Sequence, residues 1–199
     1  MQSDIALILF VRHPEPGKVK TRLAKVIGDE KALDVYNLLL NHTRQITIPA
    51  NCLKFVYYTD KVIEHDFWTL PGYDKRQQSG IDLGDRMSNA FKELFEQGFK
   101  KVIIIGSDCY QLQTEIINQA ITALTGVDVI IGPTFDGGYY LLGMSRFIPE
   151  LFVDKKWSTD QVATQTIETI SKLNLSYNLL EKLYDVDEAS DLEPNGIVI

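Results

Sequence analysis

Four basic side chains stand close together near the start of this sequence and could bind a phosphate group. Arg12, Lys18, Lys20 and Arg22 fall in one loop that also contains Gly17. Glycine lets backbone N–H groups approach an anion closely, and Arg and Lys donate charge-assisted hydrogen bonds to phosphate oxygens. The loop therefore predicts contacts to the phosphates of a nucleotide, with a solvated basic loop as the alternative. It is not a P-loop, because G-x-x-x-x-G-K-[ST] requires a glycine where Arg12 stands.

Three aspartates elsewhere in the sequence could hold a divalent cation. Asp108 closely follows an apolar run, whereas Asp185 and Asp187 lie two residues apart, so an extended backbone would turn both to one side. Carboxylates are hard oxygen ligands, and Mg²⁺ usually takes one or two of them together with the phosphates of its substrate. We therefore predict a divalent cation, magnesium or manganese, at Asp108 and Asp187. The alternatives are a helix or turn cap at Asp108 and a solvated acidic segment around Asp187.

A glycine-bearing loop supplies the candidate for acid–base chemistry. Asp136 is followed there by Gly137 and Gly138, and its carboxylate could bind a hydroxyl group, ligate a metal or act as a general base. We assign Asp136 as the catalytic candidate. The two glycines are assigned to the side of the site that faces an acceptor, because they let the backbone pass close to a ligand. A plain Asp-Gly turn is the alternative.

A second glycine-bearing loop, residues 78–86, leads into a predicted helix. Gly80 and Arg86 are expected to contact phosphate, and Asp85 is expected to cap the helix. Trp157 precedes another predicted helix. We interpret it first as core packing and second as a wall of the substrate site.

Short apolar runs precede most of these candidate residues. Two of the runs are apolar nearly throughout, which is typical of strands covered on both faces of a parallel sheet. In open sheets of this kind, ligands bind beyond the carboxyl ends of the strands, so the residues that follow the runs are expected to meet at one edge. The predicted strands cover residues 5–11, 53–58, 102–105 and 127–131.

Amphipathic stretches with helical spacing separate the runs and predict helices that cover the sheet. Ser158 or Thr159 is predicted to cap the last of them, and residues 139–142 are predicted to add a strand, of antiparallel direction, unless their tyrosines are simple core packing. The alternation of strands and helices predicts one layered α/β domain over residues 1–199 with right-handed crossovers. The predicted helices cover residues 29–45, 85–95, 114–124 and 158–173.

The composition is that of an ordinary globular domain and argues against two classes of partner. Hydrophobic residues make up 45% of the sequence and charged residues 24%, and the formal net charge is −7. Nucleic acid and anionic membranes repel such a chain, so neither is predicted as a partner. The sequence has no segment long enough to span a bilayer and no basic region of a signal peptide. Cys52 and Cys109 have no disulfide or metal spacing, and we expect a cytoplasmic protein with free thiols.

Six segments, in order, resemble the bacterial DUF2064 proteins, which are described as glycosyltransferase-A-like transferases. The resemblance covers almost the whole chain, and the six together are far more specific than any one. It implies a three-layer α/β/α domain with a mostly parallel, mixed sheet, and a nucleoside-diphosphate sugar or triphosphate in the crevice beside the first strand. It also implies that Asp108 is the metal-binding aspartate after the central strand. The segments are residues 10–24, 78–87, 105–109, 132–143, 157–159 and 185–187.

The sequence departs from the family and its superfamily at three points. Tyr110 stands where the family usually has proline after Ser-Asp-Cys, which leaves Asp108 in place. The Gly-rich loop of nucleotidyltransferases is missing from the first motif, which puts pyrophosphorylase chemistry in doubt. The paired aspartates of many glycosyltransferases are reduced to one at Ser107-Asp108.

Three functions stay open at this point. The first is metal-dependent glycosyl transfer from a nucleoside-diphosphate sugar to an acceptor that the sequence does not specify, in which the cation neutralises the leaving diphosphate. The second is nucleotidyl transfer, in which a nucleoside triphosphate releases pyrophosphate along the same basic loop. The third is a nucleotide-binding module without turnover. The oligomeric state is left open.

Overall fold

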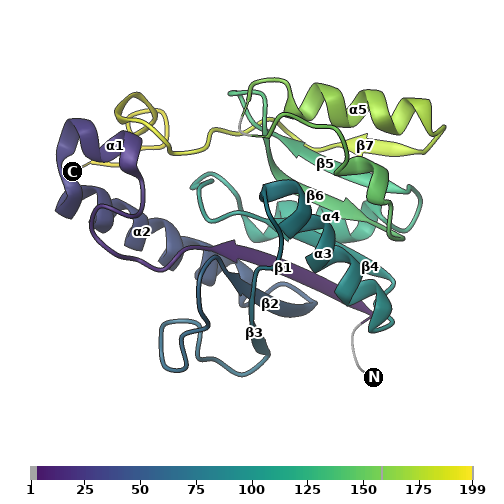
Figure 1. The fold of residues 1–199 in the computed structure, drawn as a ribbon, viewed down its shortest axis with the longest axis horizontal. Coiled ribbons are helices and arrows are strands. Elements are labelled where there is room, and N and C mark those ends of the chain that lie inside the picture. The colour runs from purple at the N-terminus through teal and green to yellow at the C-terminus, as the bar shows by residue number, and fades with distance from the viewer. Residues whose placement is uncertain (1–3, 158, 199) are drawn as a thin grey trace.

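A seven-stranded mixed sheet lies at the centre of the computed structural model, which describes residues 4–157 and 159–198 (Figure 1). The strand order is β3-β2-β1-β4-β6-β5-β7. Neighbouring strands are parallel except around β6, which runs antiparallel to both β4 and β5. The predicted mostly parallel, mixed sheet is confirmed. The strands are β1 (Ile5–Val11), β2 (Leu53–Tyr58), β3 (Tyr73–Gln77), β4 (Lys101–Ile105), β5 (Val129–Pro133), β6 (Tyr139–Met144) and β7 (Tyr177–Leu179).

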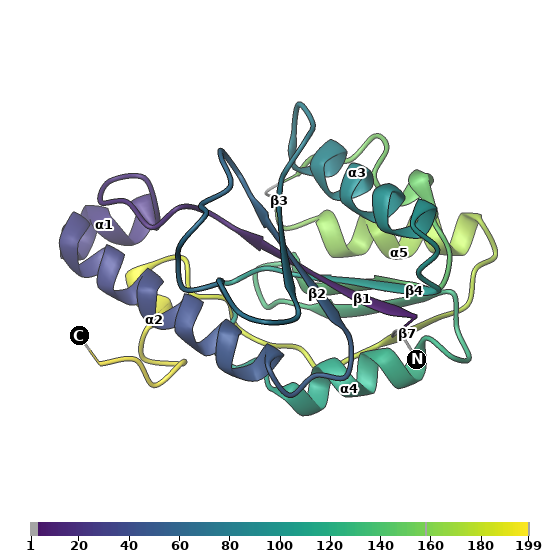
Figure 2. The same ribbon diagram turned by 90° about the horizontal axis from the view of Figure 1, so that it is seen from below.

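Helices cover both faces of the sheet, which confirms the three-layer α/β/α arrangement. Figure 2 shows α2 and α4 on one side and α3 and α5 on the other. The short helix α1 lies next to α2, beyond the edge of the sheet. The helices are α1 (Thr21–Ile27), α2 (Asp29–Thr47), α3 (Leu83–Glu96), α4 (Thr114–Ala123) and α5 (Val162–Lys172), with 3-10 turns at Pro149–Leu151 and Ala189–Asp191.

The apolar run of β1 is buried on both faces because successive side chains of a strand point to opposite sides. Leu7 and Leu9 belong to the core that α2 and α4 cover, whereas Ala6 and Ile8 belong to the core that α3 and α5 cover. All four side chains are fully buried. This double burial explains why the strand is apolar nearly throughout rather than alternating.

A third apolar cluster fixes the C-terminal part of the chain against its beginning. Leu23 of α1 and Val35 of α2 are buried together with Val186, Leu192 and Ile197. Figure 1 shows the C-terminal segment, in yellow, lying beside α1. Residues 186–197 are therefore held close to the loop that precedes α1, although most of the sequence separates them.

The predicted elements lie where expected, with two corrections at helix ends. Helix α5 begins at Val162 with Gln161 as its N-cap, so Thr159 does not cap it, and Ser158 lies outside the described residues. The Thr159 hydroxyl instead donates to the carbonyl oxygen of Lys156 at 2.8 Å.

The cap of α3 is also not the predicted residue. The N-cap is Asp82, whose side chain accepts a hydrogen bond from the backbone N–H of Asp85. Asp82 and Asp85 are both carboxylates near the start of the helix. Asp82 is the N-cap because its backbone is extended, as an N-cap residue requires, whereas Asp85 already lies inside the helix.

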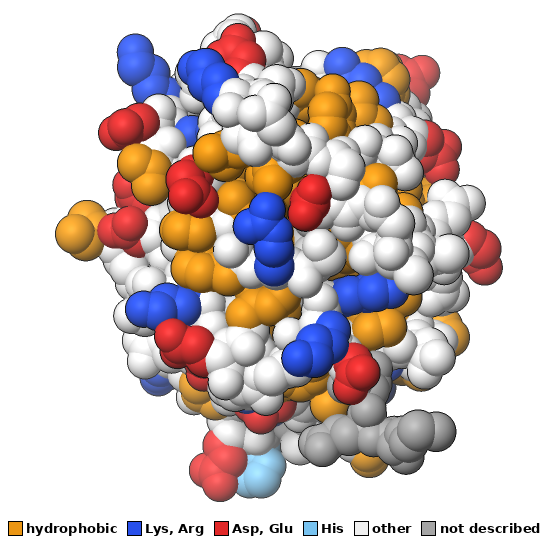
Figure 3. Space-filling model, turned by 90° about the vertical axis from the view of Figure 1, so that its right-hand side faces the viewer, with side chains coloured by type: hydrophobic (Ala, Val, Ile, Leu, Met, Phe, Trp, Pro, Cys, Tyr) orange, Lys and Arg blue, Asp and Glu red, His pale blue; other side chains and the backbone are white. Residues whose placement is uncertain are grey.

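Charged side chains of both signs are interspersed with apolar ones on the face shown in Figure 3. Among the described helices, none is long and apolar enough to cross a membrane. Cys52 and Cys109 are both free and buried, which confirms the predicted free thiols.

Candidate functional site

A cleft of about 810 Å³ opens at the carboxyl ends of β1, β2 and β4, where the predicted residues were expected to meet. Because β6 is antiparallel, its first residues lie at the same edge and also line the cleft. The structure thus brings the basic loop, the end of β4, the loop after β5 and the C-terminal segment together. The predicted residues that line the cleft are Arg12, Lys18, Lys20, Arg22, Arg86, Asp108, Asp136, Gly138 and Asp187.

Three of the predicted glycines are described by the structure but do not line the cleft: Gly17, Gly80 and Gly137. Two of them serve close packing instead. A Cβ atom on Gly80 would lie 2.7 Å from the backbone nitrogen of Arg86, and one on Gly137 would lie 2.0 Å from the carbonyl oxygen of Asp160. All three have positive φ, so they shape the loops in which the cleft-lining residues stand.

The start of the basic loop is fixed by Tyr36 of α2. The hydroxyl of Tyr36 accepts a hydrogen bond from the backbone N–H of Arg12 at 2.9 Å and lies 3.2 Å from the carbonyl oxygen of the same residue. Burial and the carboxylate of Asp108 raise the pKa of Tyr36, so its hydroxyl stays protonated. No motif in the sequence points to Tyr36, since its role depends on the packing of α2 against β1.

Lys20 lies between the two predicted metal ligands. Its Nζ is 2.6 Å from Oδ1 of Asp108 and 2.9 Å from Oδ1 of Asp187, and its side chain is 5% exposed. Burial lowers the pKa of Lys20, but the two carboxylates outweigh this effect and hold the pKa above its ordinary value. Lys20 was predicted to bind phosphate; in this structure its ammonium group binds carboxylates instead.

Asp187 reaches the site through backbone contacts of the C-terminal segment. The N–H of Val186 donates to the carbonyl oxygen of Asp108 at 2.9 Å, and the N–H of Asp187 donates to Oδ2 of Asp191. Burial raises the pKa of Asp187, but Lys20, Arg22 and Arg12 together leave the pKa below its ordinary value. Asp187 is therefore an ionised carboxylate fixed beside Asp108.

Asp185 is the buried carboxylate of the cleft. Its Oδ1 atom is buried and has no hydrogen-bond partner among the described residues. Burial, followed by the carboxylates of Asp108, Asp136 and Asp187, raises the pKa of Asp185 well above its ordinary value. The spacing of Asp185 and Asp187 predicts that both carboxylates could bridge to one cation, and the structure places Asp185 in the cleft.

The chemistry of these side chains fits a divalent cation. Asp108, Asp185 and Asp187 offer hard oxygen atoms, and among the described residues the buried Oδ1 of Asp185 has no hydrogen-bonding partner. As the described side chains stand, no three acidic, histidine or cysteine residues are arranged to hold a metal ion together. Lys20 already bridges two of the carboxylates.

Asp136 is held in a tight turn at the edge of the cleft. Its Oδ1 accepts hydrogen bonds from the hydroxyl of Thr134 and from the backbone N–H of Gly138 at 3.1 Å. The Asp-Gly turn is therefore real, and it directs the exposed carboxylate of Asp136 along the cleft lining. The two interpretations of Asp136 are compatible, because the turn uses only one of its oxygens.

Trp157 forms part of the cleft wall and also packs on the core. It contacts the apolar cluster that includes Phe152, whose ring centroid lies 6.5 Å away. Gly84 makes room for it, because a Cβ atom at that position would lie 2.2 Å from Nε1 of Trp157. This contact joins the first turn of α3 to the segment before α5.

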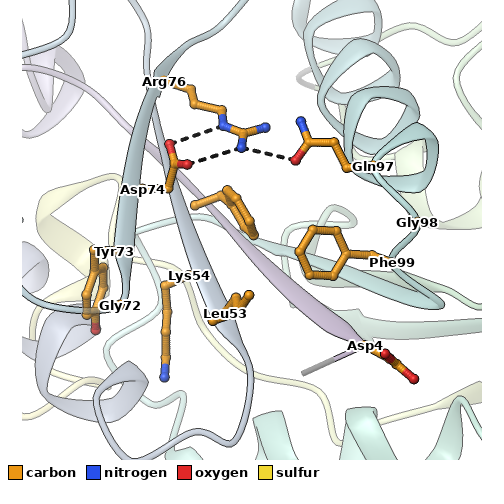
Figure 4. A pocket seen from close by; sticks show the side chains of 11 residues that line it. Asp4, Leu53, Lys54, Gly72, Tyr73, Asp74, Arg76, Gln97, Gly98 and Phe99 are labelled. Carbon is orange, nitrogen blue, oxygen red and sulfur yellow. Dashed lines mark hydrogen bonds and ion pairs between the residues drawn. The ribbon is translucent and has the colours of Figure 1, made fainter. Parts of the chain in front are cut away.

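A second, smaller pocket of about 460 Å³ lies at the other ends of the strands (Figure 4). Its lining includes Leu53, Tyr73 and Phe99, at or near the starts of β2, β3 and β4. Arg76 is paired with Asp74 and stacks on Phe55 at 4.5 Å, so its charge is already used within the protein. We therefore place the candidate site in the larger cleft.

Comparison with known proteins identifies the family of this chain. A model of a bacterial protein family, described as uncharacterized protein conserved in bacteria (DUF2064), matches residues 43–159, which include Asp108 and Asp136. No protein of the curated set matches.

Solved structures share the fold. A candidate nucleotide-diphospho-sugar transferase from Desulfovibrio desulfuricans G20 has a TM-score of 0.87 and 33% sequence identity; the match covers 94% of this chain and 84% of that one. The 4-diphosphocytidyl-2C-methyl-D-erythritol synthase from Anaerococcus prevotii DSM 20548 has a TM-score of 0.63 at 11% identity, covering 97% and 94%. CMP:2-keto-3-deoxy-manno-octonic acid synthetase, solved with CTP, has a TM-score of 0.58 at 9% identity, covering 96% of each chain.

The last two likenesses concern the fold alone, whereas the first combines a high TM-score with substantial sequence identity over nearly the whole chain. Together with the family match, they agree with the resemblance drawn from the six sequence segments. The chain therefore belongs to the DUF2064 family and has a fold of the nucleotide-diphospho-sugar transferase type.

Proposed function

We propose that this protein is a transferase that uses a nucleoside-diphosphate sugar together with a divalent cation, magnesium or manganese. The observation that carries the proposal is the meeting of Lys20 from the basic loop with Asp108 and Asp187 in one cleft. Diphosphate groups bind where cationic side chains and a carboxylate-held metal stand side by side. The relative from Desulfovibrio desulfuricans, whose name points to nucleotide-diphospho-sugar transfer, supports the same class of substrate.

The basic side chains would hold the diphosphate. Arg12, Lys18 and Arg22 line the cleft, and Arg86 lines it from the first turn of α3. Arg86 also donates from Nε to the carbonyl oxygen of Gly80 at 3.3 Å, which fixes its position and leaves its remaining donors for a ligand. These groups bind the departing nucleoside diphosphate more strongly as its negative charge grows during transfer, which lowers the barrier.

Asp108 and Asp187 would hold the cation, with Asp185 as an additional oxygen ligand. When bound, the cation neutralises the charge that develops on the leaving diphosphate. The backbone hydrogen bond from Val186 to Asp108 holds the C-terminal segment beside the end of β4, which brings both carboxylates to the same cleft.

Asp136 would receive the acceptor. Its carboxylate is exposed at the cleft and is oriented by Thr134 and Gly138. A carboxylate in this position can accept a hydrogen bond from an acceptor hydroxyl and take its proton as the new glycosidic bond forms. Trp157 and Tyr139 also line the cleft, and their rings would limit the orientation of the acceptor.

The test is to incubate the protein with nucleoside-diphosphate sugars, nucleoside triphosphates, Mg²⁺ or Mn²⁺ and a mixture of hydroxyl-bearing acceptors. Glycosyl transfer releases a nucleoside diphosphate, and this product should disappear when the cation is chelated. Release of pyrophosphate from a triphosphate would instead show nucleotidyl transfer. Metal-dependent binding with neither product would show a nucleotide-binding module.

A further inference from the structure

The position of Lys20 is unusual for a residue expected to bind phosphate. Its Nζ contacts carboxylate oxygens of Asp108 and Asp187, and only 5% of its side chain is exposed. The backbone of Lys20 has φ of +46°, a left-handed conformation that non-glycine residues seldom adopt. The ammonium group therefore acts as the counter-ion of two neighbouring carboxylates, those of Asp108 and Asp187.

Lys20 supplies a single positive charge to the paired carboxylates of Asp108 and Asp187. Asp185 also lines the cleft, and its buried Oδ1 has no hydrogen-bond partner in the part of the chain that the structure describes. A divalent cation brings twice the charge of an ammonium group and prefers carboxylate oxygen. The long, flexible stem of lysine can move the ammonium group while the backbone stays in place.

We propose that a divalent cation displaces the ammonium group of Lys20 from Asp108 and Asp187, and that Lys20 then turns to the phosphates held beside Arg12 and Arg22. Lys20 is thus the counter-ion of the carboxylates in the metal-free protein and a phosphate ligand in the loaded one. This inference rests on the cation in the proposed function. It adds that metal and lysine compete for one place, so phosphate binding by Lys20 depends on the metal.

The displacement can be measured on the wild-type protein without nucleotide. Lysine side chains are acetylated with a water-soluble reagent, with and without saturating Mn²⁺, and each site is quantified by peptide mass spectrometry. We expect the acetylation rate of Lys20 to rise several-fold when Mn²⁺ binds. Lys25, which is exposed on α1 outside the cleft, is the internal control and should not change.

A variant gives an independent measurement. Calorimetric titration with Mn²⁺, again without nucleotide, compares the wild type with Lys20→Met and with the control Lys25→Met. Because Lys20→Met removes the competing charge, its affinity for Mn²⁺ should increase by about tenfold or more, whereas Lys25→Met should match the wild type. An affinity of Lys20→Met equal to or weaker than that of the wild type would overturn the proposal.

The outcomes separate this inference from the proposed function. If Mn²⁺ binds the wild type while Lys20 stays protected from acetylation, the displacement is wrong but the metal-dependent transferase stands. If neither the wild type nor Lys20→Met binds Mn²⁺, with or without nucleotide, both the displacement and the metal site are wrong. If Lys20 becomes reactive and Mn²⁺ binds but no transfer product forms, the displacement stands and the transferase activity is wrong.

Discussion

The backbone N–H of Val186 donates a hydrogen bond of 2.9 Å to the carbonyl oxygen of Asp108. This contact joins the region just after β4 to a segment far along the chain and, together with the packing of Val186 in the third apolar cluster, holds Asp187 near Asp108. The ammonium group of Lys20 then fits between the two carboxylates. Much of the chemistry proposed for the cleft depends on this arrangement.

Replacing Asp108 by asparagine should abolish metal-dependent nucleotide binding, because the amide has lost the charge that attracts a cation. The measurement is the thermal shift that a nucleoside diphosphate produces with and without Mg²⁺, since a ligand of the native state raises its melting temperature. Asp34→Asn, an exposed position on α2, is the matched control. A variant at Asp108 that keeps the magnesium dependence of the wild type would show that the metal is held elsewhere.

Replacing Asp185 by asparagine should stabilise the metal-free protein at neutral pH. Burial and the neighbouring carboxylates raise the pKa of Asp185, so its ionised form is disfavoured in the folded state. The free energy of unfolding of the wild type therefore falls as the pH rises from the unfolded pKa toward the folded one. The free energy of unfolding of the asparagine variant does not fall in this way, because its amide side chain does not titrate.

The measurement for Asp185 is the melting temperature as a function of pH without divalent cations. The melting temperature of Asp185→Asn should exceed that of the wild type most at neutral pH. The difference should become smaller as the pH falls toward the ordinary carboxyl pKa of 3.8. At this chain length each kcal/mol corresponds to roughly 2–4 °C. A melting temperature that falls at neutral pH would mean that the carboxylate stabilises the folded protein.

Replacing Tyr36 by phenylalanine should loosen the basic loop with a small effect on stability. The change removes one hydroxyl that contacts both backbone polar groups of Arg12, so it should cost about 1 kcal/mol and weaken nucleotide binding. Chemical denaturation and nucleotide titration measure the two effects. Tyr177→Phe, on β7 away from the cleft, should leave nucleotide affinity unchanged.

Replacing Gly84 by alanine should displace Trp157. The new Cβ would stand 2.2 Å from Nε1 of Trp157, so either the indole or the first turn of α3 has to move, at a cost of about 1–3 kcal/mol. Denaturation followed by tryptophan fluorescence measures both the stability and the environment of the indole. Gly126→Ala, where the nearest atom is 4.0 Å away, should change the stability by less than about 0.5 kcal/mol.

The central strands and the helices that cover the sheet could be predicted from their hydrophobic patterns. Strands β1 and β4 are apolar nearly throughout because both of their faces are buried, whereas α2 and α3 are amphipathic because only one face is buried. The elements that were missed have weak patterns. Residues 73–77 of β3 are mostly polar because this strand forms the edge of the sheet, and β7 has only three residues. Helix α1 has one buried residue, Leu23, and depends on its contact with α2 and the C-terminal segment.

The location of the cleft could be predicted from the sequence, but the contacts between its side chains could not. The rule that ligands bind at the carboxyl ends of strands brought Arg12, Asp108 and Asp136 to one edge. The sequence could not indicate that Lys20 pairs with Asp187, which is 167 positions away, or that Tyr36 fixes Arg12. Such contacts depend on the crossing of α2 over β1 and on the packing of Val186 against α1 and α2, which local patterns do not encode.

The third apolar cluster, which holds the C-terminal segment against α1 and α2, has a consequence for biosynthesis. Proteins emerge from the ribosome N-terminus first, at roughly 5–20 residues per second. The basic loop and Asp108 are therefore made well before Asp187, and Lys20 has only one of its two carboxylate partners until Leu192 and Ile197 can dock. A nascent chain can thus form most of its sheet while its cation site is still incomplete, so binding competence comes late in synthesis.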